Sequence, residues 1–469
     1  MKVLVFGFGS SPPFLKALVE KTQIENSNVE FSVVLSSSHH LKMMSGLLGG
    51  DRVLCLHQLL PKYKDKKIKL SNLSNYPDNI FKNIEVEKIT LKNRKSDNQI
   101  HIAYWTYNLI KDFMLQTSPD YILYLQHPED MEGMLIGGLA KELNVPLAIP
   151  HHTRQIGLSF FSFHRQEILP KANHISQVYI DKAKHFLENF RESFISPSVF
   201  REDNQEFNYI PYKQKTKMAR LMSGVSRFFS ESESRELGTL RVSLLNNWFP
   251  IWRNIYRGAR KFNNKRHFNC ESINDLPKNF IYYPIQYSPE SSINIPSPYF
   301  IDQLRVIDAI RMAMPSDFLL VVKEHPVCME VRPRKFVKSL LHKAGVIVVK
   351  HNLDSQELIK KSRLVISVTG TAAFEAFLYG KPSLVMGPTF FDVCLGGVCT
   401  IDALPNRLKK AIHRKVKKES IIEFLSEVYA VSSDFLGRSP GEGEDKMMTY
   451  ENVDLFWDAF IEHTRRENE

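Results

Sequence analysis

The C-terminal half of the chain alternates short apolar runs with segments whose apolar residues recur every three or four positions. The runs are typical of strands buried on both faces of a sheet, and the longer spacing is typical of helices that pack on it. The apolar runs predict strands at residues 280–286, 318–322, 346–349, 363–367 and 383–386. Because helical patterns separate these runs, the sequence indicates a doubly wound parallel α/β sheet.

The N-terminal half shows the same alternation less regularly. Apolar runs predict strands at residues 2–6, 31–35, 121–125 and 145–149. The loop after the first run has Pro12 where the third glycine of the dinucleotide fingerprint belongs, so we predict no nicotinamide or flavin site. This half is therefore expected to form a second α/β domain.

The pattern divides the chain into four expected parts. Residues 1–170 and 276–438 form the two α/β domains, and residues 171–275, which lack strand alternation, form a mostly helical connection or insertion. Residues 439–469 begin with a loop and continue as a helix, since apolar residues recur from Val453 to Ile461 at amphipathic spacing.

Ionisable residues gather where the run 318–322 ends. The run leads directly into Lys323-Glu324-His325-Pro326, and Pro326 both stops a strand and biases His325 toward an extended conformation. Open parallel sheets bind ligands at the carboxyl ends of their strands. A lone histidine is more often structural, but three ionisable side chains leaving one strand end favour a binding or catalytic role.

A second polar segment, Ser367-Val368-Thr369-Gly370-Thr371, joins a predicted strand to a helix. Gly370 permits close approach of a ligand, Thr371 is the expected N-cap, and the free N–H groups of the first helical turn favour an anion. Glu375 lies one turn further on, where a carboxylate can accept hydrogen bonds from a ribose diol. Taken alone, the segment fits an ordinary loop equally well, with Glu375 a solvated helix residue. Together the two segments predict a pocket for a phosphate-bearing ligand.

Three segments carry a resemblance to a known family: Pro284-Ile285-Gln286 with Pro289-Glu290, then Lys323 to Pro326, then Ser367 to Pro382. They resemble the bacterial capsule polysaccharide biosynthesis family, which includes the Kdo transferases of capsule assembly and is similar to GT-B glycosyltransferases in its nucleotide-binding half. The resemblance implies a GT-B-like fold, in which two Rossmann-like domains face each other across a cleft. It places the donor site in residues 276–438 and the acceptor in residues 1–170.

The resemblance also implies roles for individual residues. His325 and the loop at 367–371 hold the phosphate of the donor, and Glu375 lies near its sugar. His325 is thus the leading catalytic candidate. The expected nucleotide-binding residues are Gln286, Glu290, Lys323, Ser367, Thr369, Gly370, Thr371 and Glu375.

An inverting sugar transfer needs a base near the acceptor hydroxyl. Two loops of the N-terminal half offer one: residues 126–130, with Glu129 and Asp130, and residues 151–154, with His152. Acids in the first turn of a helix also stabilise its dipole, so a structural role is the stronger interpretation for Glu129 and Asp130. We predict no metal site and no cofactor.

Composition agrees with a two-domain enzyme. The chain has 469 residues, of which 43% are hydrophobic, enough for two separate cores. Its five cysteines include no Cys-x-x-Cys pair, which indicates a reducing compartment and no zinc site. No run approaches the roughly 18 apolar residues of a membrane span, and the N-terminal apolar segment is too short for a signal peptide. We expect a cytoplasmic protein.

The net charge of +11 is concentrated in two stretches. Residues 241–266 hold no acid and interleave arginines and lysines with aromatic residues, including Trp248 and Trp252. Such a stretch favours a peripheral interface with the anionic inner face of the cytoplasmic membrane. For the second stretch, residues 407–418, a solvated helix face is the preferred interpretation.

The leading hypothesis is a glycosyltransferase that moves a sugar from a CMP-, UDP- or GDP-linked donor to a growing capsule or other surface polysaccharide on a lipid-linked acceptor. One alternative is a nucleotide-sugar 2-epimerase, which needs no basic aromatic surface. Another is a non-catalytic protein that binds or assembles glycans. We expect no nucleic-acid partner, since the charge comes without a recognition motif.

Overall fold

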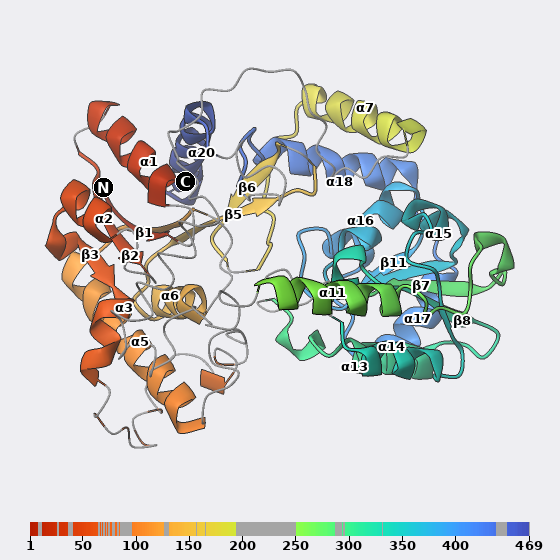
Figure 1. The fold of residues 1–469 in the computed structure, drawn as a ribbon. Helices are drawn as coiled ribbons and strands as arrows, with labels where there is room; N and C mark the ends of the chain where they lie inside the picture. The colour runs from red at the N-terminus through yellow and green to blue at the C-terminus, as the bar shows by residue number, and fades with distance from the viewer. Residues whose placement is uncertain are drawn as a thin grey trace. The chain divides into compact units, whose positions relative to one another are not determined.

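The computed structural model describes most of the chain. The described residues are 1–7, 12–25, 28–35, 41–63, 96–125, 131–155, 157–164, 166–193, 250–286, 296–330, 332–437 and 448–468, with residue 293 and isolated residues between 66 and 84. The chain divides into two compact units (Figure 1). Where it is described, unit 1 comprises residues 1–165 and 432–469, and unit 2 comprises residues 166–199 and 249–431.

Unit 1 is built on a six-stranded sheet in the order β3-β2-β1-β4-β5-β6. Its strands are β1 (Lys2–Gly7), β2 (Glu30–Leu35), β3 (Val53–Cys55), β4 (Tyr121–Tyr124), β5 (Leu147–His152) and β6 (Ser159–Ser162). Neighbouring strands are parallel except β6, which pairs antiparallel with β5. Helices of this unit include α1 (Pro12–Glu25), α2 (Leu41–Leu48), α3 (Leu56–Leu59), α5 (Ser96–Thr117), α6 (Met131–Glu142) and α20 (Tyr450–Asn468).

Helices cover both faces of this sheet. Leu4 and Phe6 of β1 pack with α5 and α6, while Val3 and Val5 of the same strand pack with α1 and α20. The alternation arises because successive side chains of a strand point to opposite faces. The predicted terminal helix is present as α20, and its Phe456 is fully buried against Phe14 of α1.

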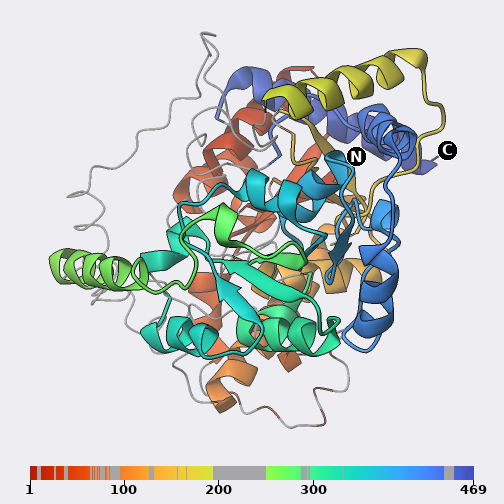
Figure 2. The ribbon, with the colours of Figure 1, turned by 90° about the vertical axis from the view of Figure 1, so that its right-hand side faces the viewer.

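Unit 2 is built on a five-stranded parallel sheet in the order β11-β10-β7-β8-β9. Its strands are β7 (Phe280–Pro284), β8 (Leu319–Lys323), β9 (Val346–Val348), β10 (Leu364–Ser367) and β11 (Ser383–Val385). Helices of this unit include α7 (Gln177–Ser193), α11 (Pro250–Asn264), α13 (Gln303–Ala313), α14 (Arg334–Leu341), α15 (Ser355–Lys361), α16 (Thr371–Leu378), α17 (Leu404–Ile412) and α18 (Lys418–Val431). Helices α13, α14 and α17 cover one face, and α15 and α16 cover the other. Figure 2 gives a second view of these elements.

The structure confirms the predicted fold class of two α/β units with doubly wound sheets. Each predicted strand is present, although β5 begins at Leu147 and runs through His152, whereas the apolar run predicted residues 145–149. The pattern missed β3 and β6, because strands of three or four residues are too short to show a period. The predicted cleft between the domains stays a prediction.

The predicted division into four parts also stays a prediction. Residues 194–249 lie outside the described residues. The described part of the expected helical connection contains α7 and α11, both in unit 2. Figure 1 shows α7 alongside α18. Among the described helices, none is long and apolar enough to cross a membrane.

Candidate functional site

The candidate site lies at the carboxyl ends of three neighbouring strands in unit 2. Strand β7 pairs with β10 on one side and with β8 on the other, all in parallel. Their ends therefore bring Gln286, His325 and the loop at 367–371 to one edge of the sheet. The strand order reverses between β7 and β10, and open α/β sheets bind ligands at such a switch point.

Gln286 and Gly370 lie in direct contact at the switch point. A Cβ atom added to Gly370 would come within 2.6 Å of Nε2 and 2.9 Å of Oε1 of Gln286. The backbone N–H of Gln286 donates to Oε1 of Gln303 at 3.0 Å, and the hydroxyl of Tyr283 donates to the same oxygen at 2.7 Å. These bonds fix the backbone of Gln286, so a side chain at position 370 would have to displace the Gln286 amide.

The 367–371 loop leads into α16 through Gly370. The N-cap residue is Gly370, so the expectation that Thr371 caps the helix was wrong: Thr371 is the first helical residue. The Ser367 hydroxyl donates to the Gly370 carbonyl at 3.1 Å and is fully buried, and Thr369 is also buried. Both side chains are therefore packed inside the protein, and the Ser367 hydrogen bond stabilises the loop. The first backbone N–H groups of α16 lack partners in the helix, as at any helix start.

Glu375 is buried, with 7% of its surface exposed, so the interpretation as a solvated helix residue was wrong. Burial raises the pKa of Tyr379 to about 12, and the Glu375 carboxylate adds to this shift. The same carboxylate helps to raise the pKa of Tyr282, a fully buried residue of β7. The carboxyl group of Glu375 therefore lies close to both tyrosine hydroxyls. Its contact with a ribose stays a prediction.

Lys323 is anchored to the start of α15. Its Nζ donates to the Leu353 carbonyl at 2.5 Å and to the Ser355 hydroxyl at 2.7 Å. Burial lowers the pKa of Lys323, while the nearby Asp354 carboxylate opposes that shift. A role in nucleotide binding stays a prediction, but these bonds already hold two of the three ammonium protons.

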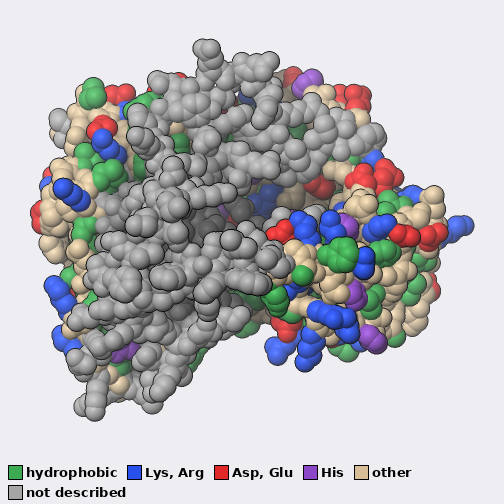
Figure 3. All heavy atoms as spheres, viewed as in Figure 1, with side chains coloured by type: hydrophobic (Ala, Val, Ile, Leu, Met, Phe, Trp, Pro, Cys, Tyr) green, Lys and Arg blue, Asp and Glu red, His purple; other side chains and the backbone are tan. Residues whose placement is uncertain are grey.

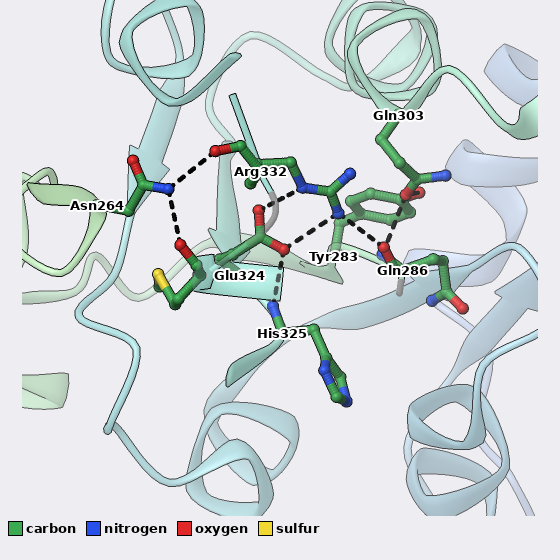
Figure 4. Close-up of polar contacts among 8 residues, drawn as sticks. Asn264, Tyr283, Gln286, Gln303, Glu324, His325 and Arg332 are labelled. Carbon is green, nitrogen blue, oxygen red and sulfur yellow. Dashed lines mark hydrogen bonds and ion pairs between the residues drawn. The ribbon is translucent and has the colours of Figure 1, made fainter. Parts of the chain in front are cut away.

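Glu324 points into unit 2 and pairs with Arg332 (Figure 4). Arg332 donates from Nε to Glu324 Oε2 at 2.8 Å and from Nη2 to Oε1 at 3.2 Å. Glu324 Oε1 also accepts the backbone N–H of His325 at 2.9 Å. The sequence suggested that the three ionisable side chains leave the strand end together. The structure shows that they do not. His325 is exposed, and Figure 4 shows its ring pointing away from the buried pair.

Sequence reasoning missed Arg332. It stands in Val331-Arg332-Pro333, where no motif or period distinguishes it from a surface arginine. Only the fold shows that its guanidinium reaches Glu324 and the Gln286 carbonyl, the latter at 2.9 Å. A buried carboxylate at the end of a strand is the one signal that calls for such a partner.

The acceptor-side candidates are only partly described. Glu129, Asp130 and the donor-side candidate Glu290 lie outside the described residues. His152 is half-buried, and its Nδ1 accepts the backbone N–H of Arg154 at 2.8 Å. The expected loop at 151–154 was partly wrong, because the first two of its residues belong to β5 and pair with β6.

Trp248 lies outside the described residues. Trp252 belongs to α11, but the side chains of this helix are described only from Tyr256 onward. Tyr256 is 61% exposed and Phe262 is 59% exposed. Arg260 lies over the Tyr256 ring and Arg266 over the Phe262 ring, at 4.5 and 3.8 Å from the ring centres. Figure 3 shows further cationic side chains over α11 and α14. The described surface of α11 is therefore both basic and aromatic.

Two doubly wound units, one of them with a polar site at its strand ends, define an α/β protein with two Rossmann-like domains. Residues 245–429 match the model of the capsule polysaccharide biosynthesis protein family. The match contains the whole sheet of unit 2, so the resemblance expected from the three segments is confirmed there.

Two curated relatives match shorter parts of the chain. The capsule polysaccharide export protein KpsS of Escherichia coli is 27% identical over 130 residues, covering 26% of this chain and 33% of KpsS. Protein FixF of Sinorhizobium fredii is 25% identical over 205 residues, covering 40% of this chain and 48% of FixF. The chain thus spans a third and about half of the lengths of these relatives.

Solved structures show more distant similarity. The β-Kdo 2,7-transferase of KpsC from Thermosulfurimonas dismutans is 13% identical, with a TM-score of 0.33 over 75% of this chain and 89% of that one. UDP-GlcNAc 2-epimerase from Methanocaldococcus jannaschii is 10% identical, with a TM-score of 0.27 over 92% of this chain and 98% of that one. Neither similarity assigns a reaction.

Proposed function

We propose that the protein is a glycosyltransferase that moves a sugar from a nucleotide-activated donor to a growing capsule or other surface polysaccharide. One observation carries the proposal: Gln286, His325 and the N-terminus of α16 lie at adjacent strand ends beside the switch point of unit 2. This region falls within residues 245–429, which match the capsule polysaccharide family.

Each group in this arrangement meets a need of the reaction. The donor leaves as a nucleotide whose phosphate gains negative charge as the glycosidic bond breaks. Hydrogen-bond donors already directed at that charge stabilise the transition state. In the proposal, the N–H groups of α16 and the His325 imidazole act as such donors, and no metal ion is needed. Glu375 would accept hydrogen bonds from the ribose.

The acceptor must lose a proton as the new bond forms. In the proposal, Glu129, Asp130 or His152 of unit 1 takes this proton. His152 is half-buried, and its Nδ1 already accepts a backbone hydrogen bond, so Nε2 is the nitrogen through which it would act. Because this base belongs to unit 1 and the donor site to unit 2, transfer would require acceptor bound to unit 1 and donor bound to unit 2.

A lipid-linked acceptor would bring the protein to the inner face of the cytoplasmic membrane. The exposed aromatic and cationic side chains of α11 support this part of the proposal, because rings insert among headgroups while cations pair with phosphate. The cytoplasmic location itself stays part of the proposal.

The test begins with the nucleotide. CMP, UDP and GDP are added separately, and the one that raises the melting temperature most identifies the donor base, since a ligand of the folded state stabilises it. Sugars linked to that nucleotide are then incubated with protein and glycolipid. Transfer of label to the glycolipid supports the proposal. Change of the donor sugar without acceptor indicates the epimerase, and binding without turnover indicates the non-catalytic alternative.

A further inference from the structure

Arg332 joins two of the loops that form the candidate donor site. Its Nη2 donates to the Gln286 carbonyl at 2.9 Å, after β7, and its Nε and Nη2 donate to the Glu324 carboxylate, after β8. The side chains of Arg332 and Glu324 are 9% and 6% exposed. One buried guanidinium thus fixes two strand ends at once (Figure 4).

The segment that carries Arg332 is itself held from a third element. Asn264, the last residue of α11, is buried and donates from Nδ2 to the carbonyls of Met329 at 2.9 Å and Arg332 at 3.0 Å. The Arg332 guanidinium also lies over the Phe336 ring of α14, 4.6 Å from its centre. Since backbone and side chain are both fixed, the guanidinium has little freedom to release either loop.

We infer that Arg332 is a positioning residue of the donor site, which holds His325 through Glu324 and Gln286 through its carbonyl. The inference rests on the proposed function, because both loops are assigned there to the donor nucleotide. The planar fork of arginine matches this task, since it offers several donors in fixed directions. Lysine has one nitrogen and cannot span both the carboxylate and the carbonyl in this geometry.

Stability and positioning can be separated at this pair. Removing one partner of a buried ion pair leaves an uncompensated charge, whereas replacing both by apolar residues is often neutral. Arg332→Met and Glu324→Leu should each lower the melting temperature, and the double variant should recover most of the loss. The double variant nevertheless loses the bond from the His325 N–H to Glu324 and the bond from Arg332 to the Gln286 carbonyl.

The first readout is hydrogen exchange in the ligand-free protein. Peptides that contain the His325 amide should exchange at least tenfold faster in the double variant, while peptides from β10 keep their wild-type rate. The matched control is Lys343→Met with Asp308→Leu, which removes a half-buried pair in the same unit, with Nζ to Oδ2 at 2.6 Å, away from these loops. That control should leave the His325 peptide unchanged.

The second readout is affinity for whichever of CMP, UDP and GDP stabilises the wild type. The double variant and Arg332→Lys should bind it at least tenfold more weakly than wild type and than the control pair. Arg332→Lys serves as the decisive variant if the double variant does not fold. Wild-type exchange at His325 together with wild-type affinity in Arg332→Lys or the double variant would overturn the inference. Failure of all three nucleotides to bind the wild type refutes the proposed function, whereas the exchange result still decides whether Arg332 holds the loop.

Discussion

Replacing Gly370 by alanine should weaken nucleotide binding and lower the free energy of unfolding by about 2 kcal/mol. The backbone at Gly370 has φ of −75°, which alanine adopts without strain, so the effect is steric. The new methyl group would lie 2.6 Å from Nε2 of Gln286, and ordinary contact begins at 3.4 Å. The Gln286 amide must therefore move by about 0.8 Å.

The substitution has two costs, one in the free energy of unfolding and one in nucleotide affinity. The amide loses its bond to the Pro284 carbonyl, 3.2 Å long, and α16 exchanges glycine for alanine at its N-cap. Each change costs about 1 kcal/mol of unfolding free energy. A misplacement of about 1 Å in a binding group, by contrast, can cost about a hundredfold in function. We expect nucleotide affinity to fall by between about tenfold and a hundredfold.

Calorimetric titration with the nucleotide that stabilises the wild type measures the affinity, and urea unfolding measures the stability. Gly258→Ala is the matched control, because nothing lies within 4 Å of the Cβ it would add. This variant should bind normally and gain up to about 1 kcal/mol from better helix propensity. Wild-type affinity in Gly370→Ala would refute the reasoning, since it would mean that the position of Gln286 does not matter to the ligand.

Three further predictions concern other parts of the chain. His325→Ala should lower transferase turnover by about two orders of magnitude, the scale of losing one transition-state hydrogen-bond donor, and should leave the melting temperature nearly unchanged because the residue is exposed. A folded variant with full activity would rule out this role. Burial lowers the pKa of His463 to about 3, with Arg466 adding to the shift, so protons bind the unfolded state preferentially and stability falls as pH drops from about 6.5 toward 3. At pH 5 this amounts to about 2 kcal/mol, and His463→Phe should flatten the fall in urea unfolding; an unchanged slope would contradict it. Charge reversal at Arg257, Arg260 and Arg266 should release the protein from vesicles with anionic lipid, as added salt should; equal binding to neutral vesicles would contradict the membrane claim.

The sheets could be predicted from the sequence because their signal is strong and local. Five consecutive apolar residues, as in 318–322, fit a strand buried on both faces, and β8 lies there, shifted by one residue. The site loops follow from the same logic, since the ends of parallel strands meet at one edge. The sequence therefore predicts His325 and Gly370 as site residues.

Side-chain direction is what the sequence could not supply. Lys323, Glu324 and His325 are consecutive, yet Lys323 binds the start of α15, Glu324 binds Arg332, and His325 is exposed. The directions of Lys323 and Glu324 depend on which partners the fold brings close, and these partners lie on other elements of unit 2. The N-cap error at Thr371 has a related cause. Hydroxyl residues are favoured caps, but here the cap is Gly370, where an added Cβ would meet the Gln286 amide.

These directions bear on the electrostatics proposed for the donor site. Glu324 is neutralised by a guanidinium with good geometry, and Lys323 is tied to a carbonyl and a hydroxyl, so neither charge is directed freely outward. A phosphate at this edge would then meet mainly His325 and the N–H groups of α16. Glutamine at position 325 would keep a neutral hydrogen-bond donor there, whereas alanine would remove it. Nucleotide affinity should therefore fall less in His325→Gln than in His325→Ala. Equal affinities in the two variants would show that a hydrogen bond from residue 325 does not contribute to binding.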